Sequence, residues 1–203
     1  MDGQPTDAQP SPDLRDLAER LQAICVGRSW TVVTAESCTG GLVADSLTDV
    51  PGSSGYVLGG IVAYQDQVKA AQLGVPTQTI AAHGAVSVQV ARAMATGARE
   101  RIGATFGVSV TGIAGPGGGS EAKPVGLTYI AVAGPDGVEV RRFSWSGDRR
   151  ANKRDSARAA LELLIVAAEA AGAAGSGEAA RAAEAPGADE GAAPEESAPA
   201  GAR

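Results

Sequence analysis

The chain has 203 residues and a formal net charge of -6; 44% of its residues are hydrophobic, but only 3% are aromatic. This length fits one folded domain, and an acidic chain with few aromatic side chains does not resemble a nucleic-acid-binding protein. Two cysteines and one histidine are too few for a disulfide framework or a zinc site, and no apolar run is long enough to span a bilayer. The start of the chain also lacks a signal-peptide pattern, so we expect a cytoplasmic protein without membrane contact.

Composition divides the chain into three parts. Residues 1–10 are polar and are expected to be disordered, while residues 11–170 carry the periodic apolar pattern of a single α/β domain. Residues 171–203 are almost wholly Ala, Gly, Glu, Pro and Ser and contain no large apolar residue. Burial cannot offset the ordering entropy of such a segment, so we predict a disordered acidic tail.

The first elements alternate between helix and strand. Ser11, Pro12 and Asp13 indicate a helix start with Ser11 as the cap, and apolar residues then recur at helical spacing up to Gly27. A β-rich run over 30–34 follows, and it leads through a turn rich in Ser, Thr and Gly into a helix over 41–47.

The middle of the chain repeats this alternation. A strand over 59–64 precedes a helix that contains Lys69 and stops at Gly74, and His83 is placed in a polar loop. Ser87 is expected to cap a longer helix that ends at Gly103, before a strand over 105–110.

The last elements predict a mixed sheet. A Gly-Pro-Asp-Gly turn at 134–137 separates the runs 126–133 and 138–145, which favours an antiparallel hairpin. Asp148 is expected to cap a final helix whose apolar stripe extends to Ala168.

The turn at 34–41 is the strongest candidate for chemistry. A strand that becomes a helix leaves backbone N–H groups unpaired, and Ser37 lies where its hydroxyl can face the sheet edge. The N–H groups expected to form an oxyanion hole beside it belong to Thr39, Gly40 and Gly41.

Three alternatives stay open at this turn. Ser37 can instead be a helix cap, which is the commonest use of serine at such a position. Cys38 is a rival nucleophile, because a helix N-terminus can lower a thiol pKa. Glu36 is either an acid that caps the helix or a hydrogen-bond partner of the site.

A serine nucleophile needs a base. His83 has no evident carboxylate partner, so a Ser-His-Asp triad is not favoured. Lys69 lies just beyond the strand over 59–64, near the same sheet edge, and a desolvated lysine can act as a base. The alternative is an ordinary surface lysine on a helix.

A second glycine-rich loop, 111–119, follows the strand over 105–110, so the two loops are expected at neighbouring strand ends, where open α/β sheets bind ligands. Neither loop has a phosphate-loop or dinucleotide fingerprint, so ATP and NAD binding are not predicted, and either loop alone could be a structural turn. Lys123, Arg149 and Arg154 are candidate phosphate contacts or solvated surface charges. A local basic cluster that could bind a phosphate is formed by Arg149-Arg150 with Lys153-Arg154.

In these segments the chain resembles the CinA carboxy-terminal domains, several of which are nicotinamide mononucleotide amidohydrolases. The similar segments, in family order, are 35–41, 51–54, Tyr64 with Lys69 and 73–75, 83–87, 111–118, 123–126 and 147–149. One difference is Gln-Asp-Gln-Val at 65–68, where many relatives have Ser-Asn-Glu-Ala.

The resemblance implies a three-layer α/β/α fold with a mixed, mostly parallel sheet, assembled as a homodimer or higher oligomer. It implies a pyridine-nucleotide salvage step: hydrolysis of nicotinamide mononucleotide to nicotinate mononucleotide and ammonia, with Ser37 as nucleophile, Lys69 as base and no metal or organic cofactor. A nucleotide-binding module without catalysis is the alternative. With the turn and the cations above, the predicted substrate contacts are Glu36, Thr39, Gly40, Gly41, Tyr64, Thr111, Gly112, Ala114, Gly115, Gly117 and Arg149.

Overall fold

The computed structural model describes the backbone of residues 13–183 and the side chains of residues 13–173. Its centre is a five-stranded sheet in the order β2-β1-β3-β4-β5. The strands are β1 (Val32–Glu36), β2 (Val57–Val62), β3 (Phe106–Gly112), β4 (Leu127–Gly134) and β5 (Gly137–Ser144). β1 pairs in parallel with β2 and β3, and β4 is antiparallel to both β3 and β5. Four strands therefore share one direction, which confirms a mixed, mostly parallel sheet.

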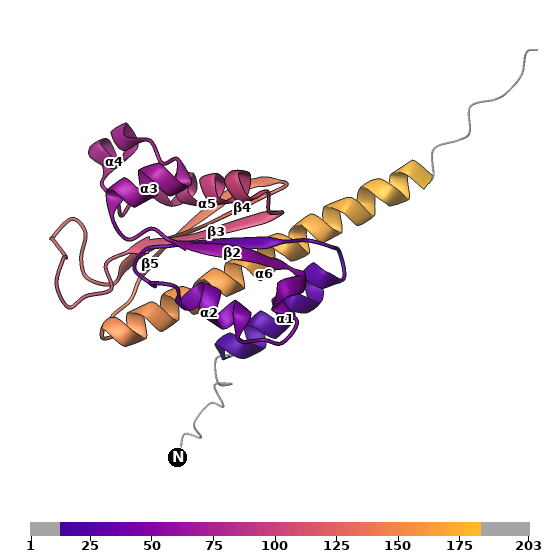
Figure 1. Ribbon diagram of the computed structural model, residues 1–203, viewed down its shortest axis with the longest axis horizontal. Helices are drawn as coiled ribbons and strands as arrows, with labels where there is room; N and C mark the ends of the chain where they lie inside the picture. The colour runs from indigo at the N-terminus through magenta and orange to yellow at the C-terminus, as the bar shows by residue number, and fades with distance from the viewer. Residues whose placement is uncertain (1–12, 184–203) are drawn as a thin grey trace, which may run out of the picture.

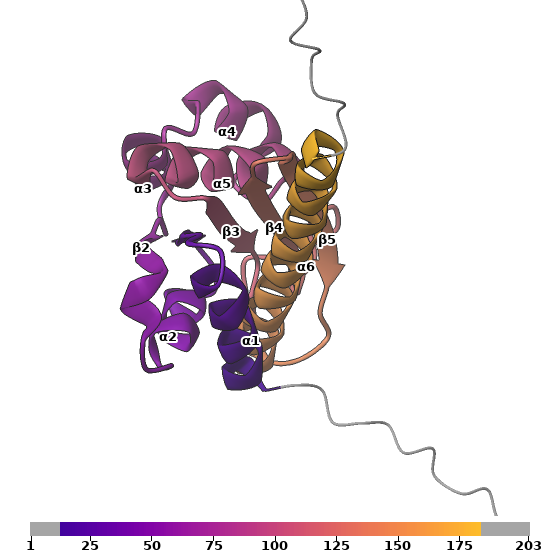
Figure 2. The same ribbon diagram turned by 90° about the vertical axis from the view of Figure 1, so that its right-hand side faces the viewer.

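Helices cover both faces of the sheet and confirm the three-layer prediction (Figure 1). One layer contains α1 (Leu14–Val26), α2 (Leu42–Thr48) and α6 (Arg149–Ala183), and the other contains α3 (Asp66–Leu73), α4 (Thr77–His83) and α5 (Val88–Ile102). A 3₁₀ turn, η1 (Ser53–Gly55), leads into β2. Figure 2 shows α1 lying against the long α6, which it contacts.

The alternation of side chains along β1 divides the core between the two layers. All five residues of β1 are buried. Val32 packs with α1, α2 and α6, whereas Val33 and Ala35 pack with α3 and α5. Glu36 is four residues from Val32 and therefore lies on the α2 side of the sheet.

Most predicted helix boundaries are confirmed. Ser87 accepts a hydrogen bond from the Val90 N–H (3.3 Å), and Asp148 accepts one from the Ala151 N–H (2.8 Å). The first helix differs, because Asp13 is its N-cap and forms a capping box with Asp16. Ser11, the predicted cap, lies outside the described residues.

Two expectations need correction. His83 is the last residue of α4, not part of a loop, and its carbonyl accepts a hydrogen bond from Lys123 Nζ (2.6 Å). The predicted boundary between residues 170 and 171 falls inside α6, which continues to Ala183. Alanine, glutamate and arginine favour helix, and extending a packed helix needs no new nucleus. The predicted disorder of 1–10 and 184–203 concerns residues outside those described.

Within 13–183, no helix has both the length and the apolarity needed to cross a bilayer.

Candidate active site

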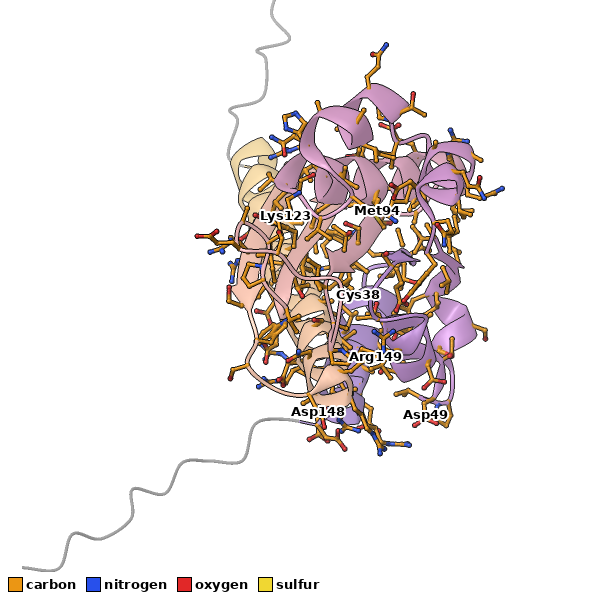
Figure 3. The ribbon with its side chains drawn as sticks, turned by 90° about the vertical axis from the view of Figure 1, so that its left-hand side faces the viewer. Cys38, Asp49, Met94, Lys123, Asp148 and Arg149 are labelled. Carbon is orange, nitrogen blue, oxygen red and sulfur yellow. The ribbon has the colours of Figure 1, made fainter. Side chains whose placement is uncertain are left out.

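The site lies where the three parallel strands end. Ser37 follows β1, Tyr64 comes shortly after β2, and Gly112 ends β3. The chain leaves β1 toward α2 on one face and leaves β2 toward α3 on the other, so this edge contains the point where the strand order reverses. Figure 3 views this edge and shows Cys38 between the two helical layers, with Arg149 at the start of α6 below it.

A cavity of about 260 Å³ opens at this edge. The predicted residues that line it are Ser37, Tyr64, Lys69, Thr111, Gly112, Ala114, Gly115, Gly117 and Arg149. Its other lining residues are Cys38, Asp66, Ala85, Val86, Ile113 and Gly118. Four predicted contacts are not among the lining residues: Glu36, Thr39, Gly40 and Gly41. Both loops therefore contribute to the cavity at this sheet edge, as expected, but residues 39–41 of the first turn, which lead into α2, do not.

Glu36 acts inside the fold as the cap of α2. It is 1% exposed, and its carboxylate accepts the N–H groups of Gly41 (3.0 Å), Val43 (3.0 Å) and Ala44 (2.8 Å). The hydroxyl of Thr34 donates a fourth hydrogen bond to it (3.2 Å). A carboxylate complements the positive end of the helix, which answers the question left open by the sequence.

This cap changes the expected oxyanion hole. The Gly41 N–H is used by Glu36, and the Gly40 N–H donates to the Ser37 carbonyl (3.2 Å). Thr39 is fully buried. The Cys38 N–H comes directly after Ser37 and belongs to a residue that lines the cavity. Among residues 13–173 no oxygen accepts it; it and the Thr39 N–H both point toward the Cys38 sulfur. Of these two residues only Cys38 lines the cavity, so we infer that its N–H is the donor of this turn best placed for an oxyanion.

Ser37, rather than Cys38, is the nucleophile that the turn favours. The Ser37 N–H donates to the Val110 carbonyl (2.9 Å), which anchors the turn to β3. The N-cap position of α2 is occupied by Gly41, four residues after Ser37, so Ser37 is not the helix cap. Burial raises the pKa of the Cys38 thiol to about 12, so this thiol stays protonated near neutral pH.

Lys69 is buried in the cavity wall, and the interpretation as a surface lysine is wrong. Its side chain comes from α3 and the residue is 1% exposed. Its Nζ donates to the Tyr64 carbonyl (3.1 Å) and lies 3.4 Å from Oδ1 of Asp66. The amine is therefore held in the same cavity as the Ser37 hydroxyl.

Side chains from α6 hold the glycine-rich loop. Arg149 donates to the Gly115 carbonyl (2.8 Å) and to the Tyr64 hydroxyl (3.3 Å), which joins this loop to the end of β2. Asn152, which is 1% exposed, donates to the Ala114 carbonyl (3.1 Å). Asn152 was not predicted as a site residue, because its only sequence signal is its place one turn after the predicted cap Asp148.

The remaining predicted contacts have structural partners. The Thr111 hydroxyl lines the cavity but donates to the Ala85 carbonyl (2.9 Å). Lys123 binds the end of α4, as described above, and Arg154 lies 3.6 Å from Asp13. Among the described residues no group of three or more His, Cys, Asp or Glu is arranged to hold a metal.

A second hollow lies away from this chemistry. It has a volume of about 360 Å³ and lies between the β4–β5 hairpin and α6. Phe106, Val132 and Val138 contribute to its largely apolar wall, and the ionisable residues among those described there are Asp136 and Glu139. Within residues 13–173 it holds no nucleophile with a base, so the cavity at Ser37 is the better candidate for an active site.

The fold and the cavity define an α/β domain with a ligand-sized cleft at the switch point of an open sheet. The sequence profile of the CinA C-terminal domain matches residues 14–168, and the chain belongs to this family. Known structures agree: a competence/damage inducible protein, CihA, from Agrobacterium tumefaciens is 44% identical with a TM-score of 0.75, over 77% of this chain and 96% of that one.

Curated relatives are longer. A CinA-like protein of Chlorobaculum tepidum is 52% identical over 155 residues, which are 74% of this chain and 37% of that protein. A CinA-like protein of Anaeromyxobacter sp. strain K is 50% identical over 152 residues, 75% of this chain and 37% of that protein. The chain thus spans little more than a third of the length of these relatives.

Proposed function

We propose that the protein hydrolyses the carboxamide of nicotinamide mononucleotide, yielding nicotinate mononucleotide and ammonia. The observation that carries this proposal is the burial of Lys69 beside the cavity that Ser37 also lines. A buried amine next to a hydroxyl is the arrangement that serine–lysine acyl transfer requires. The substrate itself follows from the resemblance to CinA domains.

The reaction proceeds in two halves. Lys69 acts as the base that accepts the Ser37 proton as Oγ attacks the carboxamide carbon, and the Cys38 N–H stabilises the resulting oxyanion. The carbon–nitrogen bond then breaks, and the proton passes from Lys69 to the leaving ammonia. Water next attacks the acyl-enzyme ester with Lys69 again as base, which releases the carboxylate and returns the proton to Ser37.

A nucleotide-binding module without turnover is the second candidate. The contacts of Lys69 Nζ are the Tyr64 carbonyl and Asp66, and no hydrogen bond joins it to Ser37 among the described residues. An amine engaged in this way also suits a cavity that only binds its ligand.

Ammonia release from nicotinamide mononucleotide separates the two candidates. We expect the wild type to release ammonia and Ser37→Ala to lose the rate by roughly 10³-fold or more. Cys38→Ala is the matched control at the next residue and keeps the rate within about threefold, because its protonated thiol takes no part in the chemistry. Binding of the nucleotide without ammonia release by the wild type would establish the binding module instead.

A further inference from the structure

We propose that a cationic groove beside the cavity is a phosphate-monoester subsite, formed chiefly by Arg150 and Lys153. The groove has a volume of about 450 Å³ and is lined by Leu42, Arg149, Arg150, Lys153 and Arg154. This inference rests on the proposed function, since the expected occupant is the phosphate of the mononucleotide whose amide reaches Ser37.

The charges of the groove are only partly neutralised. Arg154 lies 3.6 Å from Asp13, and Arg149 is bound to the Gly115 carbonyl and the Tyr64 hydroxyl. Within the described part of the chain, Arg150 and Lys153 have neither a hydrogen bond nor an ion pair. Two positive charges thus remain free on a chain whose net charge is -6. A phosphate monoester carries nearly two negative charges at neutral pH, which matches them.

The position of these cations opposes local helix stability. Arg149 and Arg150 lie in the first turn of α6, which contains no acidic residue; Lys153 and Arg154 follow in the second turn, and the acid at this end of the helix is the cap Asp148. Cations at the positive end of a helix destabilise it, and acids would be the stabilising choice there. A sequence that breaks a local rule in this way is typical of a functional site.

The groove continues from the cavity. Arg149 lines both, so it forms the wall that the two hollows share. Lys153 extends over the Ser37 turn: its Nζ lies 3.5 Å from the position that a Cβ on Gly40 would take. A ligand whose amide lies at Ser37 can therefore place an anionic group at Arg150 and Lys153, past Arg149.

The test compares ligands with and without the phosphate. Equilibrium binding of nicotinamide mononucleotide, nicotinamide riboside and inorganic phosphate is measured by calorimetry on the wild type and on Arg150→Gln/Lys153→Gln. We expect the double variant to bind the mononucleotide about 10- to 100-fold more weakly and the riboside unchanged. In steady state we expect the same rise in KM with kcat within about threefold.

Two matched variants control for charge. Arg150→Lys/Lys153→Arg keeps both cations, and we expect it to retain most of the affinity. Arg92→Gln removes one positive charge from α5, which lies on the other face of the sheet, and we expect no change in phosphate dependence. Melting temperatures check that every variant is folded.

The outcomes separate this proposal from the proposed function. Equal loss of mononucleotide and riboside affinity, or no loss of either, overturns the phosphate subsite even when ammonia is released. Inorganic phosphate that binds in the groove without competing with the mononucleotide also overturns it, and indicates a separate anion site. Phosphate-dependent binding that the double variant abolishes supports the subsite even if the wild type releases no ammonia, in which case only the amidase proposal fails.

Discussion

Two segments face each other across the cavity, and they are held in opposite ways. The turn at 37–41 is held mainly by its sequence neighbour Glu36, which accepts N–H groups at the start of α2, and one bond to a distant strand, from the Ser37 N–H to the Val110 carbonyl of β3, adds to this. The loop at 113–126 is closed at its base by the bond from the Gly126 N–H to the Ile113 carbonyl (2.7 Å). Above this base, Arg149 and Asn152 of the distant helix α6 hold it.

This difference divides the work of the site. A nucleophile requires a fixed position, and local hydrogen bonds to a buried carboxylate provide one. On the opposite wall, residues 117–122 of the loop are exposed. We infer that the Ser37 turn sets the chemistry, while the glycine-rich loop and α6 set which ligand is accepted.

The largest effect is expected on the chemical side of this comparison. Lys69→Met removes the base and fills its buried site with an apolar side chain of similar length. We expect ammonia release to fall by roughly 10³-fold with little change in melting temperature, since general bases contribute about 10²- to 10⁴-fold.

Lys123→Met is the matched control for this substitution. Lys123 also donates to a backbone carbonyl, that of His83, but does not line the cavity. We expect its rate to stay within about threefold of the wild type. Equal rates for Lys69→Met and the wild type would remove Lys69 from the mechanism.

A smaller effect is expected when the local support of the turn is weakened. Glu36→Gln replaces an acceptor-only carboxylate by an amide whose NH₂ group faces backbone donors. Hydrogen bonds to a buried charge contribute about 1.5–3 kcal/mol, so we expect the free energy of unfolding in urea to fall by about 3 kcal/mol. Glu139→Gln removes an exposed carboxylate that is paired with Arg141 on β5, and about 0.5 kcal/mol or less is expected there. Similar values for the two variants would contradict the capping role of Glu36.

The helix caps and the hairpin turn could be predicted from the sequence, because local signals determine them. Glycine and serine punctuation predicted the caps at Ser87 and Gly103, and the turn at 134–137 predicted the β4–β5 hairpin. The two candidate loops were expected at one sheet edge, and both contribute to the cavity wall. Periodicity and turn chemistry act over a few residues, so one sequence is enough to interpret them.

Features that depend on distant contacts were missed or left open. The burial of Lys69 follows from how α3 packs, which its spacing from the strand does not reveal. The capping role of Glu36 depends on how α2 is oriented relative to β1, which the sequence does not reveal. The hydrogen bond from Asn152 to the Ala114 carbonyl joins residues 38 positions apart. Residues 171–183 were predicted to be disordered because they contain no large apolar residue, whereas α6 continues through them, as the helix propensity of alanine, glutamate and arginine allows.

The smallest effect is expected in the glycine-rich loop, where two cavity-lining glycines form a matched pair. Gly115 has a φ of +85°, and a Cβ there would lie 2.5 Å from Cγ1 of Val125, whereas a Cβ on Gly117 would meet nothing within 4 Å. We expect Gly115→Ala to lower the free energy of unfolding by roughly 1–2 kcal/mol, because L-residues disfavour the left-handed region. Gly117→Ala should leave the free energy of unfolding within about 0.5 kcal/mol of the wild type, since the added methyl group is unstrained.

The same pair tests whether this loop selects the ligand. If it does, Gly117→Ala changes the KM for the mononucleotide more than its kcat, because a methyl group is added to the cavity lining without moving Ser37 or Lys69. A fall in kcat alone would place the loop with the chemistry, and equal stabilities for the two variants would show that the Arg149 and Asn152 contacts do not hold the loop in this conformation.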